Sequence, residues 1–170
     1  MLERIIGVFK LDVNTYEEIE HDENATSQAA IVVAIVAILS GIGSGILASF
    51  NDGNFIISFI GALIWAFVGW FLWSAATYFI GTTLFDGRAT MGEMLRVIGF
   101  AQAPQILGII PCIGILGWIW SLVTGFIAVR QGLDLDNTKS AITIAVGAII
   151  YLIGWFIING TTAFAGGMFG

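Results

Sequence analysis

This sequence of 170 residues has few charged residues. Only 11% of its residues are Asp, Glu, Lys or Arg, and 58% are hydrophobic, whereas a soluble domain has about 25% charged residues. Its 6 basic residues are too few for the basic stripe with which nucleic-acid-binding proteins hold phosphates. We therefore exclude nucleic acid as a partner and expect the chain to lie in a lipid bilayer.

Cysteine and histidine are almost absent as well, with one residue of each, Cys112 and His21. A lone cysteine excludes an intrachain disulfide and any multi-cysteine metal site. His21 lies in "EEIEHDE", where we expect solvated carboxylates rather than a metal site, so no cofactor is expected. The sequence contains no G-x-S-x-G or H-E-x-x-H motif. With no candidate catalytic residue, we expect a protein that is not an enzyme.

Long apolar runs are what the sequence does have. The segment from Gly53 to Phe85 carries no charge over 33 residues, and about 20 apolar residues suffice to cross a bilayer. We predict an all-α fold, a polytopic transmembrane helical bundle. Its five spans are expected at about 28–50, 55–81, 91–110, 113–130 and 140–159, within a membrane domain of residues 25–160.

The third span decides the topology, because residues 91–110 could instead form a helix on the membrane surface. With five spans, all six basic residues face one compartment. With four, Arg130 and Lys139 would cross to the other side. Basic loops favour the cytoplasm, so we predict five spans, a cytoplasmic amino terminus and an outside carboxy terminus. The location is a membrane crossed several times, the plasma membrane if the source is prokaryotic.

The first 24 residues form an acidic cytoplasmic head that holds seven of the 12 acidic residues. Leu2, Ile5, Ile6 and Phe9 fall on one helical face, which indicates an amphipathic helix at the membrane interface. We expect Asn14 to cap the next segment and its carboxylates to point into the cytoplasm. The head is then either a docking surface for a cytoplasmic protein or simply a solvated face. Residues 161–170 form a glycine-rich tail.

Polar and small residues recur within the third segment, "RVIGFAQAPQILGIIP". A helix is expected to begin near Met91, because Thr90 and Glu93 have the spacing of a capping box. Pro104 lacks an amide hydrogen, so we expect a kink there, and Arg96 is expected to pair with Glu93 or with phosphate. Together, the polar and small residues of this segment either form interhelical hydrogen bonds or line the polar cavity of a small-solute or lipid transporter. Its members are Glu93, Arg96, Gly99, Gln102, Pro104 and Gln105.

The first span contains a second set of small residues, in "SGIGSG". Ser40 and Ser44 repeat at four positions, as do Gly41 and Gly45, and this spacing lets two helices approach closely. Internal packing and a homo-oligomer face both fit the pattern.

The whole arrangement resembles the Yip-one family of Ypt/Rab-interacting membrane proteins, in its short prokaryotic form. The resemblance covers the acidic head, the five hydrophobic segments and "LRVIGFAQAP", which is similar to the family's Gly-aromatic-x-x-x-Pro motif at Gly99, Phe100 and Pro104. The aspartate-leucine-tyrosine-glycine-proline motif of eukaryotic members and their long cytosolic head are absent. The resemblance implies a polytopic membrane protein without a known reaction, linked in eukaryotes to Golgi and endoplasmic-reticulum trafficking and to oligomerisation. Our own expectation is a non-enzymatic protein that acts by helix association and by organising membrane or partner proteins.

Overall fold

The computed structural model describes residues 1–109, 114–150 and 152–153. Across these residues the chain is helical and contains no strand, in agreement with the predicted all-α class. Several predictions lie outside the described residues. They concern Pro111 and Cys112, the end of the fifth span and the tail 161–170.

The head consists of two short helices, α1 (Leu2–Phe9) and α2 (Val13–His21). The turn between them places Leu11 at a φ of 59°. Asp12, and not Asn14 as the sequence suggested, caps α2, because its carboxylate accepts the Asn14 amide at 3.2 Å. The same carboxylate accepts the Thr15 hydroxyl at 3.0 Å. The short side chain of Asp12 thus satisfies the exposed donors of the first turn.

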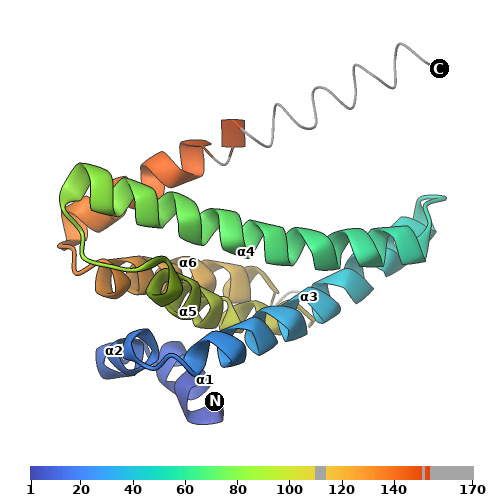
Figure 1. Ribbon diagram of the computed structural model, residues 1–170. Helices are drawn as coiled ribbons and strands as arrows, with labels where there is room; N and C mark the ends of the chain where they lie inside the picture. The colour runs from blue at the N-terminus through green and yellow to red at the C-terminus, as the bar shows by residue number, and fades with distance from the viewer. Residues whose placement is uncertain (110–113, 151, 154–170) are drawn as a thin grey trace.

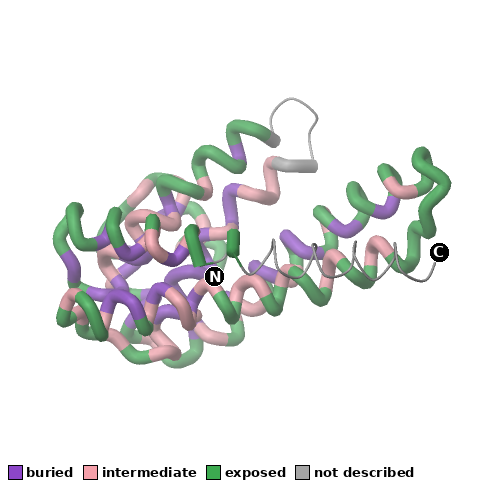
Figure 2. The backbone as a smooth tube through the Cα atoms, turned by 90° about the horizontal axis from the view of Figure 1, so that it is seen from above, coloured by how far each residue is buried: buried purple, intermediate pink, exposed green. Residues whose placement is uncertain are grey.

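Helices α3 (Ala25–Phe50) and α4 (Phe55–Phe85) form a long antiparallel hairpin. Asn54 caps α4 by accepting the Ile57 amide at 3.1 Å. Figure 2 shows the tip of the hairpin projecting away from the rest of the molecule, with mostly exposed residues. There Gly41 and Gly45 of α3 lie against the rings of Phe59 and Phe55 of α4.

The predicted third span is not one kinked helix. Helix α5 (Met91–Ala101) ends three residues before Pro104, and a 3₁₀ helix, η1 (Ala103–Ile109), follows. Helix α6 (Gly114–Gly132) then returns along both. Because proline has no amide hydrogen to continue an α-helical ladder, the α-helix ends before Pro104 and the chain continues as a 3₁₀ helix.

The core lies at the other end of the hairpin, where α3 and α4 diverge and enclose α5 and α6 (Figure 1). Its largest fully buried side chains come from the head, from α5 and from the loop after α6: Tyr16, Ile19, Met94, Phe100 and Leu133. The Arg88 amide donates to the Leu133 carbonyl at 3.0 Å. The loop before α5 and the loop after α6 therefore lie together, at the end of the bundle that carries the head.

Within the described residues, three helices are long and apolar enough to cross a membrane: α3, α4 and residues Ile115–Gly132 of α6. The helix Asn137–Ile150 is apolar but shorter. Helix α5 has only 11 residues, and neighbouring helices bury seven of them. The structure therefore accounts for three of the five predicted spans among the described residues.

Candidate functional site: the junction between head and bundle

Arg96 of α5 connects the bundle to the head. Its side chain is 7% exposed, and its Nε donates to the Glu20 carbonyl oxygen at 2.9 Å. Its Nη2 donates to the same oxygen, and Nη1 donates to the Thr26 hydroxyl at 3.5 Å. The expected pairing of Arg96 with Glu93 is wrong, since α2 covers Arg96 and supplies a backbone acceptor.

Glu93 instead completes the predicted capping box. Its carboxylate accepts the Thr90 amide at 2.6 Å, and its own amide donates to the Thr90 hydroxyl at 3.2 Å. These reciprocal bonds satisfy donors that the first turn of α5 would otherwise expose. The prediction that a helix begins at Met91 is confirmed.

The head is bound to α6 by three further hydrogen bonds. The buried Tyr16 hydroxyl donates to the Thr124 carbonyl at 3.3 Å. Trp120 Nε1 donates to the Phe9 carbonyl at 3.0 Å, and Gln131 Nε2 donates to Glu17 at 2.8 Å. The acidic head is therefore a folded part of the molecule that packs along α5 and α6.

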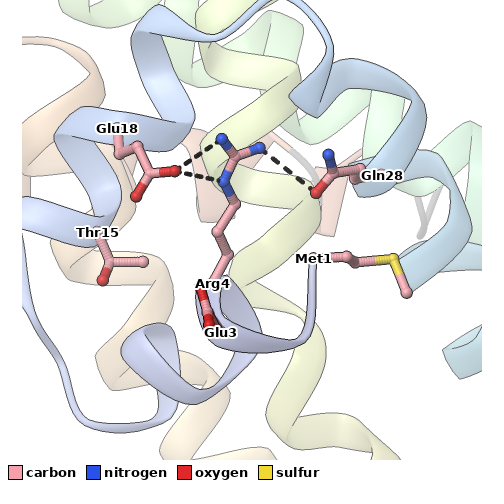
Figure 3. A pocket seen from close by; sticks show the side chains of 6 residues that line it. All are labelled: Met1, Glu3, Arg4, Thr15, Glu18 and Gln28. Atoms are coloured by element: carbon pink, nitrogen blue, oxygen red, sulfur yellow. Dashed lines mark hydrogen bonds and ion pairs between the residues drawn. The ribbon is translucent and has the colours of Figure 1, made fainter.

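A polar cavity of about 230 Å³ lies in the head around Arg4 (Figure 3). The Arg4 guanidinium forms ion pairs with Glu18 and Asp22, each at 2.7 Å, and contacts the Gln28 amide oxygen at 3.4 Å. The hydrogen bond from Arg4, assisted by the Asn24 amide, lowers the pKa of Asp22. Arg4 thus connects α1, α2 and the start of α3.

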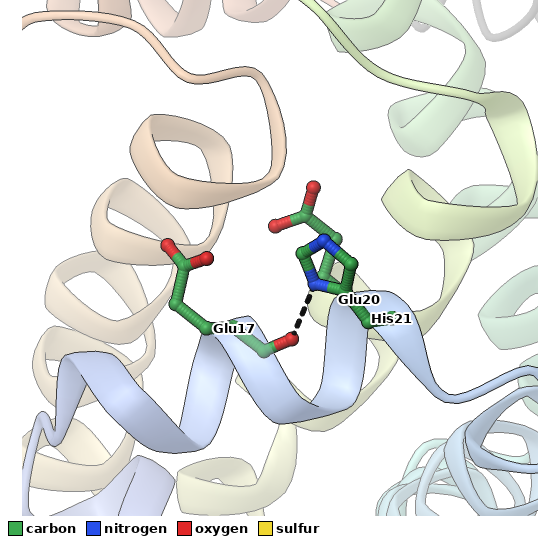
Figure 4. A group of neighbouring side chains, drawn as sticks. All are labelled: Glu17, Glu20 and His21. Carbon is green, nitrogen blue, oxygen red and sulfur yellow. Dashed lines mark hydrogen bonds between the residues drawn. The ribbon is translucent and has the colours of Figure 1, made fainter.

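Three side chains on α2 form an acidic group beside this junction: Glu17, Glu20 and His21 (Figure 4). Glu20 is 6% exposed, and its Oε2 has no hydrogen-bond partner among the described residues. The prediction that these carboxylates are solvated is therefore wrong for Glu20, because α2 packs against the bundle. Burial, followed by the nearby Glu17 carboxylate, raises the pKa of Glu20 to about 7. The hydrogen bond to the Glu17 carbonyl, and then the Glu20 charge, raise the pKa of His21.

Gly99 lies where α5 approaches both α3 and α4. A Cβ atom at Gly99 would stand 2.8 Å from the Ala29 Cβ and 3.1 Å from Trp70 Nε1. That indole nitrogen donates to the Leu95 carbonyl at 3.0 Å. Only glycine allows this spacing without displacing a neighbour.

The remaining polar residues of the third segment lie around the end of α5. Pro104 is buried, and its carbonyl would stand 2.6 Å from a Cβ atom at Gly117 of α6. The free carbonyl of Ala101 accepts the Thr124 hydroxyl at 2.8 Å. Gln102 and Gln105 are half-buried, and neither side chain forms a hydrogen bond with another described residue. The structure thus brings Gln102, Pro104 and Gln105 near α6. Glu93 instead caps the start of α5, and Arg96 binds α2 of the head.

The two pairs of small residues in α3 point in different directions. Gly41 and Gly45 are buried against α4, while Ser40 and Ser44 are exposed.

Sequence reasoning missed the Glu20 carbonyl as the partner of Arg96, because a backbone acceptor 76 positions away has no sequence signature. It did consider the acidic stretch around His21, but expected its carboxylates to be solvated and so missed the group that Glu17, Glu20 and His21 form on α2. That group did have a signal, since positions 17, 20 and 21 fall on one face of a helix.

Comparison with known proteins identifies the family. Neither the curated proteins nor the solved structures gave a match. The family model for the Yip1 domain matches residues 6–159, which cover both the head and the bundle. The resemblance inferred from the acidic head, the apolar segments and "LRVIGFAQAP" is thus confirmed, and the chain belongs to the Yip1 domain family.

Proposed function

We propose that this protein is a non-enzymatic, multi-pass membrane scaffold whose folded acidic head is a docking surface for a cytoplasmic protein. The observation that carries the proposal is the attachment of the head to the bundle. Arg96 joins α2 to α5, and Tyr16 joins α2 to α6. A head attached in this way moves with the membrane domain, so that a partner bound to it is fixed relative to the bilayer.

Five spans with a cytoplasmic amino terminus agree best with the positions of the basic residues. The bonds from Arg88 to Leu133 and from Lys139 to Phe85, the latter at 3.4 Å, keep two loops at the head end. Arg96 and Arg4 lie at the head itself. Basic residues gathered at one end favour a cytoplasmic location for that end.

The bilayer position follows from the exposure of α4. At 1.5 Å per residue its 31 residues extend about 46 Å, more than the ~30 Å of a hydrocarbon core. Buried residues of α4 begin only at Ser74, whereas the preceding half exposes large apolar side chains such as Ile57, Ile64 and Phe71. We therefore place this half of α4 in lipid.

Helix α1 fits the interface between lipid and cytoplasm. Ile5 and Phe9 pack against the core, while Leu2, Ile6 and Val13 are exposed and can enter the headgroup region. Attachment to the bundle and contact with lipid would then hold the head from two sides.

The surroundings of Pro104 favour a scaffold over a transporter. A transport site at a broken helix uses free backbone groups to bind its solute. Here the Ala101 carbonyl is bound by Thr124, and the Pro104 carbonyl lies against Gly117. The break is therefore filled by α6.

The test places a photo-crosslinking residue at Glu3 or Glu23, two exposed acidic positions of the head. In native membranes we expect each to give an adduct of defined mass with a protein of the cytoplasmic side. The matched control is Asn51 at the hairpin tip, which is equally exposed but lies at the opposite end. The proposal fails if the head positions give no adduct, or only the adducts that Asn51 gives.

A further inference from the structure

The acidic group on α2 has the arrangement of a metal site. Glu17, Glu20 and His21 occupy positions i, i+3 and i+4, which share one face of a helix. One ligand atom from each side chain lies within 4.8 Å of the other two. Figure 4 shows the three side chains on the same side of the helix axis.

Glu20 provides independent evidence that a ligand belongs here. Its side chain is more than nine-tenths buried, yet Oε2 has no hydrogen-bond partner among the described residues. A buried carboxylate without a partner is costly unless it takes up a proton or a cation compensates its charge. The nearby Arg96 directs its donors to the Glu20 carbonyl and to Thr26 instead. Asp134 and Glu93 add further negative charge around the carboxylate.

Hydrogen bonds hold His21 and Glu17 in the way that is usual for metal ligands. A carbonyl oxygen only accepts hydrogen bonds, so His21 Nδ1 carries a hydrogen and donates it to the Glu17 carbonyl at 2.8 Å. This bond leaves Nε2 with its lone pair free, on the side of the Glu20 carboxylate in Figure 4. Glu17 Oε1 accepts the Gln131 amide at 2.8 Å, which leaves its second oxygen available. In known metal sites, a ligating imidazole donates its other N–H and a ligating carboxylate accepts a further hydrogen bond, and these bonds orient the ligands.

We propose that Glu17, Glu20 and His21 bind a divalent transition-metal cation, with Zn²⁺ as the representative ion. Imidazole together with carboxylates suits zinc and its neighbours, whereas Ca²⁺ and Mg²⁺ prefer oxygen ligands alone. Tetrahedral zinc holds ligand atoms about 3.4 Å apart. The exposed His21 and the half-buried Glu17 can close the remaining distance by side-chain rotation. Water completes the coordination.

A cation at this position acts on the junction as well as on α2. It neutralises the buried carboxylate of Glu20, whose backbone carbonyl holds Arg96. It also fixes Glu17 next to Gln131 of α6. Metal binding should therefore stabilise the attached head, whether or not the head binds a cytoplasmic protein.

The test is titration of the full-length protein in detergent micelles with ZnCl₂, followed by calorimetry, after removal of metal with EDTA and of any histidine tag. We expect saturable binding of one Zn²⁺ per chain. His21→Gln and Glu20→Gln should each weaken it at least about tenfold. Glu23→Gln, an exposed acid outside the group, is the matched control and should bind as the unaltered protein does.

A second measurement separates loss of a ligand from loss of folding. His21 is exposed, so His21→Gln should leave the melting temperature of the metal-free protein unchanged. Zn²⁺ should raise the melting temperature of the unaltered protein, because a ligand that binds only the folded state stabilises it. It should not raise that of His21→Gln. The proposal is overturned if Zn²⁺ does not saturate at micromolar concentration, if His21→Gln binds it equally well, or if Ca²⁺ competes at equal concentration.

Discussion

At the scale of single residues, Arg96 decides how the head is held. A buried guanidinium must place its donors on acceptors, since leaving them unpaired is costly. Its acceptor, the Glu20 carbonyl, lies in the last turn of α2, where helical carbonyls have no partner within the helix. Arg96 therefore also brings a positive charge to the negative end of the α2 dipole.

Replacement of Arg96 should detach α2. We expect Arg96→Met to weaken head attachment by about 1.5–3 kcal/mol, the usual contribution of a hydrogen bond to a charged group. Hydrogen–deuterium exchange of the α2 amides should accelerate accordingly. Arg88→Met, which removes an exposed arginine of the neighbouring loop, should leave exchange unchanged. Equal exchange in both variants would show that Arg96 does not hold the head.

The local part of this site could be predicted from the sequence and the distant part could not. Thr90 and Glu93 are three residues apart, and their capping box depends only on that spacing. The partner of Arg96 depends on how α2 folds back over α5, which no spacing records. The burial of Glu20 follows from the same packing and was missed for the same reason.

At the scale of helices, the break between α5 and η1 is closed by α6. Thr124 is fully buried, and its hydroxyl donates to the Ala101 carbonyl at 2.8 Å, with the Trp120 carbonyl of its own helix as a second acceptor within reach at 3.1 Å. Gln102, which the sequence singled out, forms no side-chain hydrogen bond with a described residue. The helix end is thus satisfied by a threonine on another helix, not by the glutamine beside it.

This difference predicts the order of two substitutions. Thr124→Val keeps the shape but removes the hydroxyl, and should lower the free energy of unfolding by about 0.6 and at most about 2 kcal/mol. Gln102→Leu should lower it by less. The comparison is made by SDS titration in mixed micelles, with Thr82→Val as control, because Thr82 bonds only within α4. If Gln102→Leu costs more than Thr124→Val, this account of the break is incorrect.

Close helix packing at Gly99 predicts that Gly99→Ala lowers the stability of the protein, the opposite of the usual effect of this substitution. Gly→Ala within a helix normally stabilises, since alanine has the higher helix propensity. At Gly99 the new methyl would press on Ala29 and Trp70, so we expect Gly99→Ala to destabilise by about 1–3 kcal/mol. Gly61→Ala in α4 meets nothing within 4 Å and should be neutral or stabilising. Unfolding in the same micelles measures both, and a stable Gly99→Ala would contradict the close approach.

One limit of each long helix could be predicted, because it depends on an apolar run and a local cap, whereas α3 begins at Ala25 instead of position 28 and α4 ends at Phe85 instead of position 81. The second predicted span, 55–81, begins where α4 does, next to the capping residue Asn54. The first, 28–50, ends with α3. The single kinked helix expected for the third span was wrong, because apolar composition does not distinguish an α-helix that bends at Pro104 from one that ends and continues as a 3₁₀ helix.

At the scale of the whole molecule, the two ends of the bundle differ. One end carries the head, the basic residues and the core, while the other is the exposed tip of the α3–α4 hairpin (Figures 1 and 2). This polarity is the basis of the proposed orientation, with the head end in the cytoplasm and the tip outside.

The most direct test of this polarity is labelling of single cysteines in intact membranes with a reagent that does not cross the bilayer, in a Cys112→Ser background. A cysteine at Asn54, next to the hairpin tip, should react from outside. Cysteines at Asp86 and Asp134, in the two loops of the head end, should react only after the membrane is opened. Labelling of Asp134 from outside, or protection of Asn54, would contradict the account.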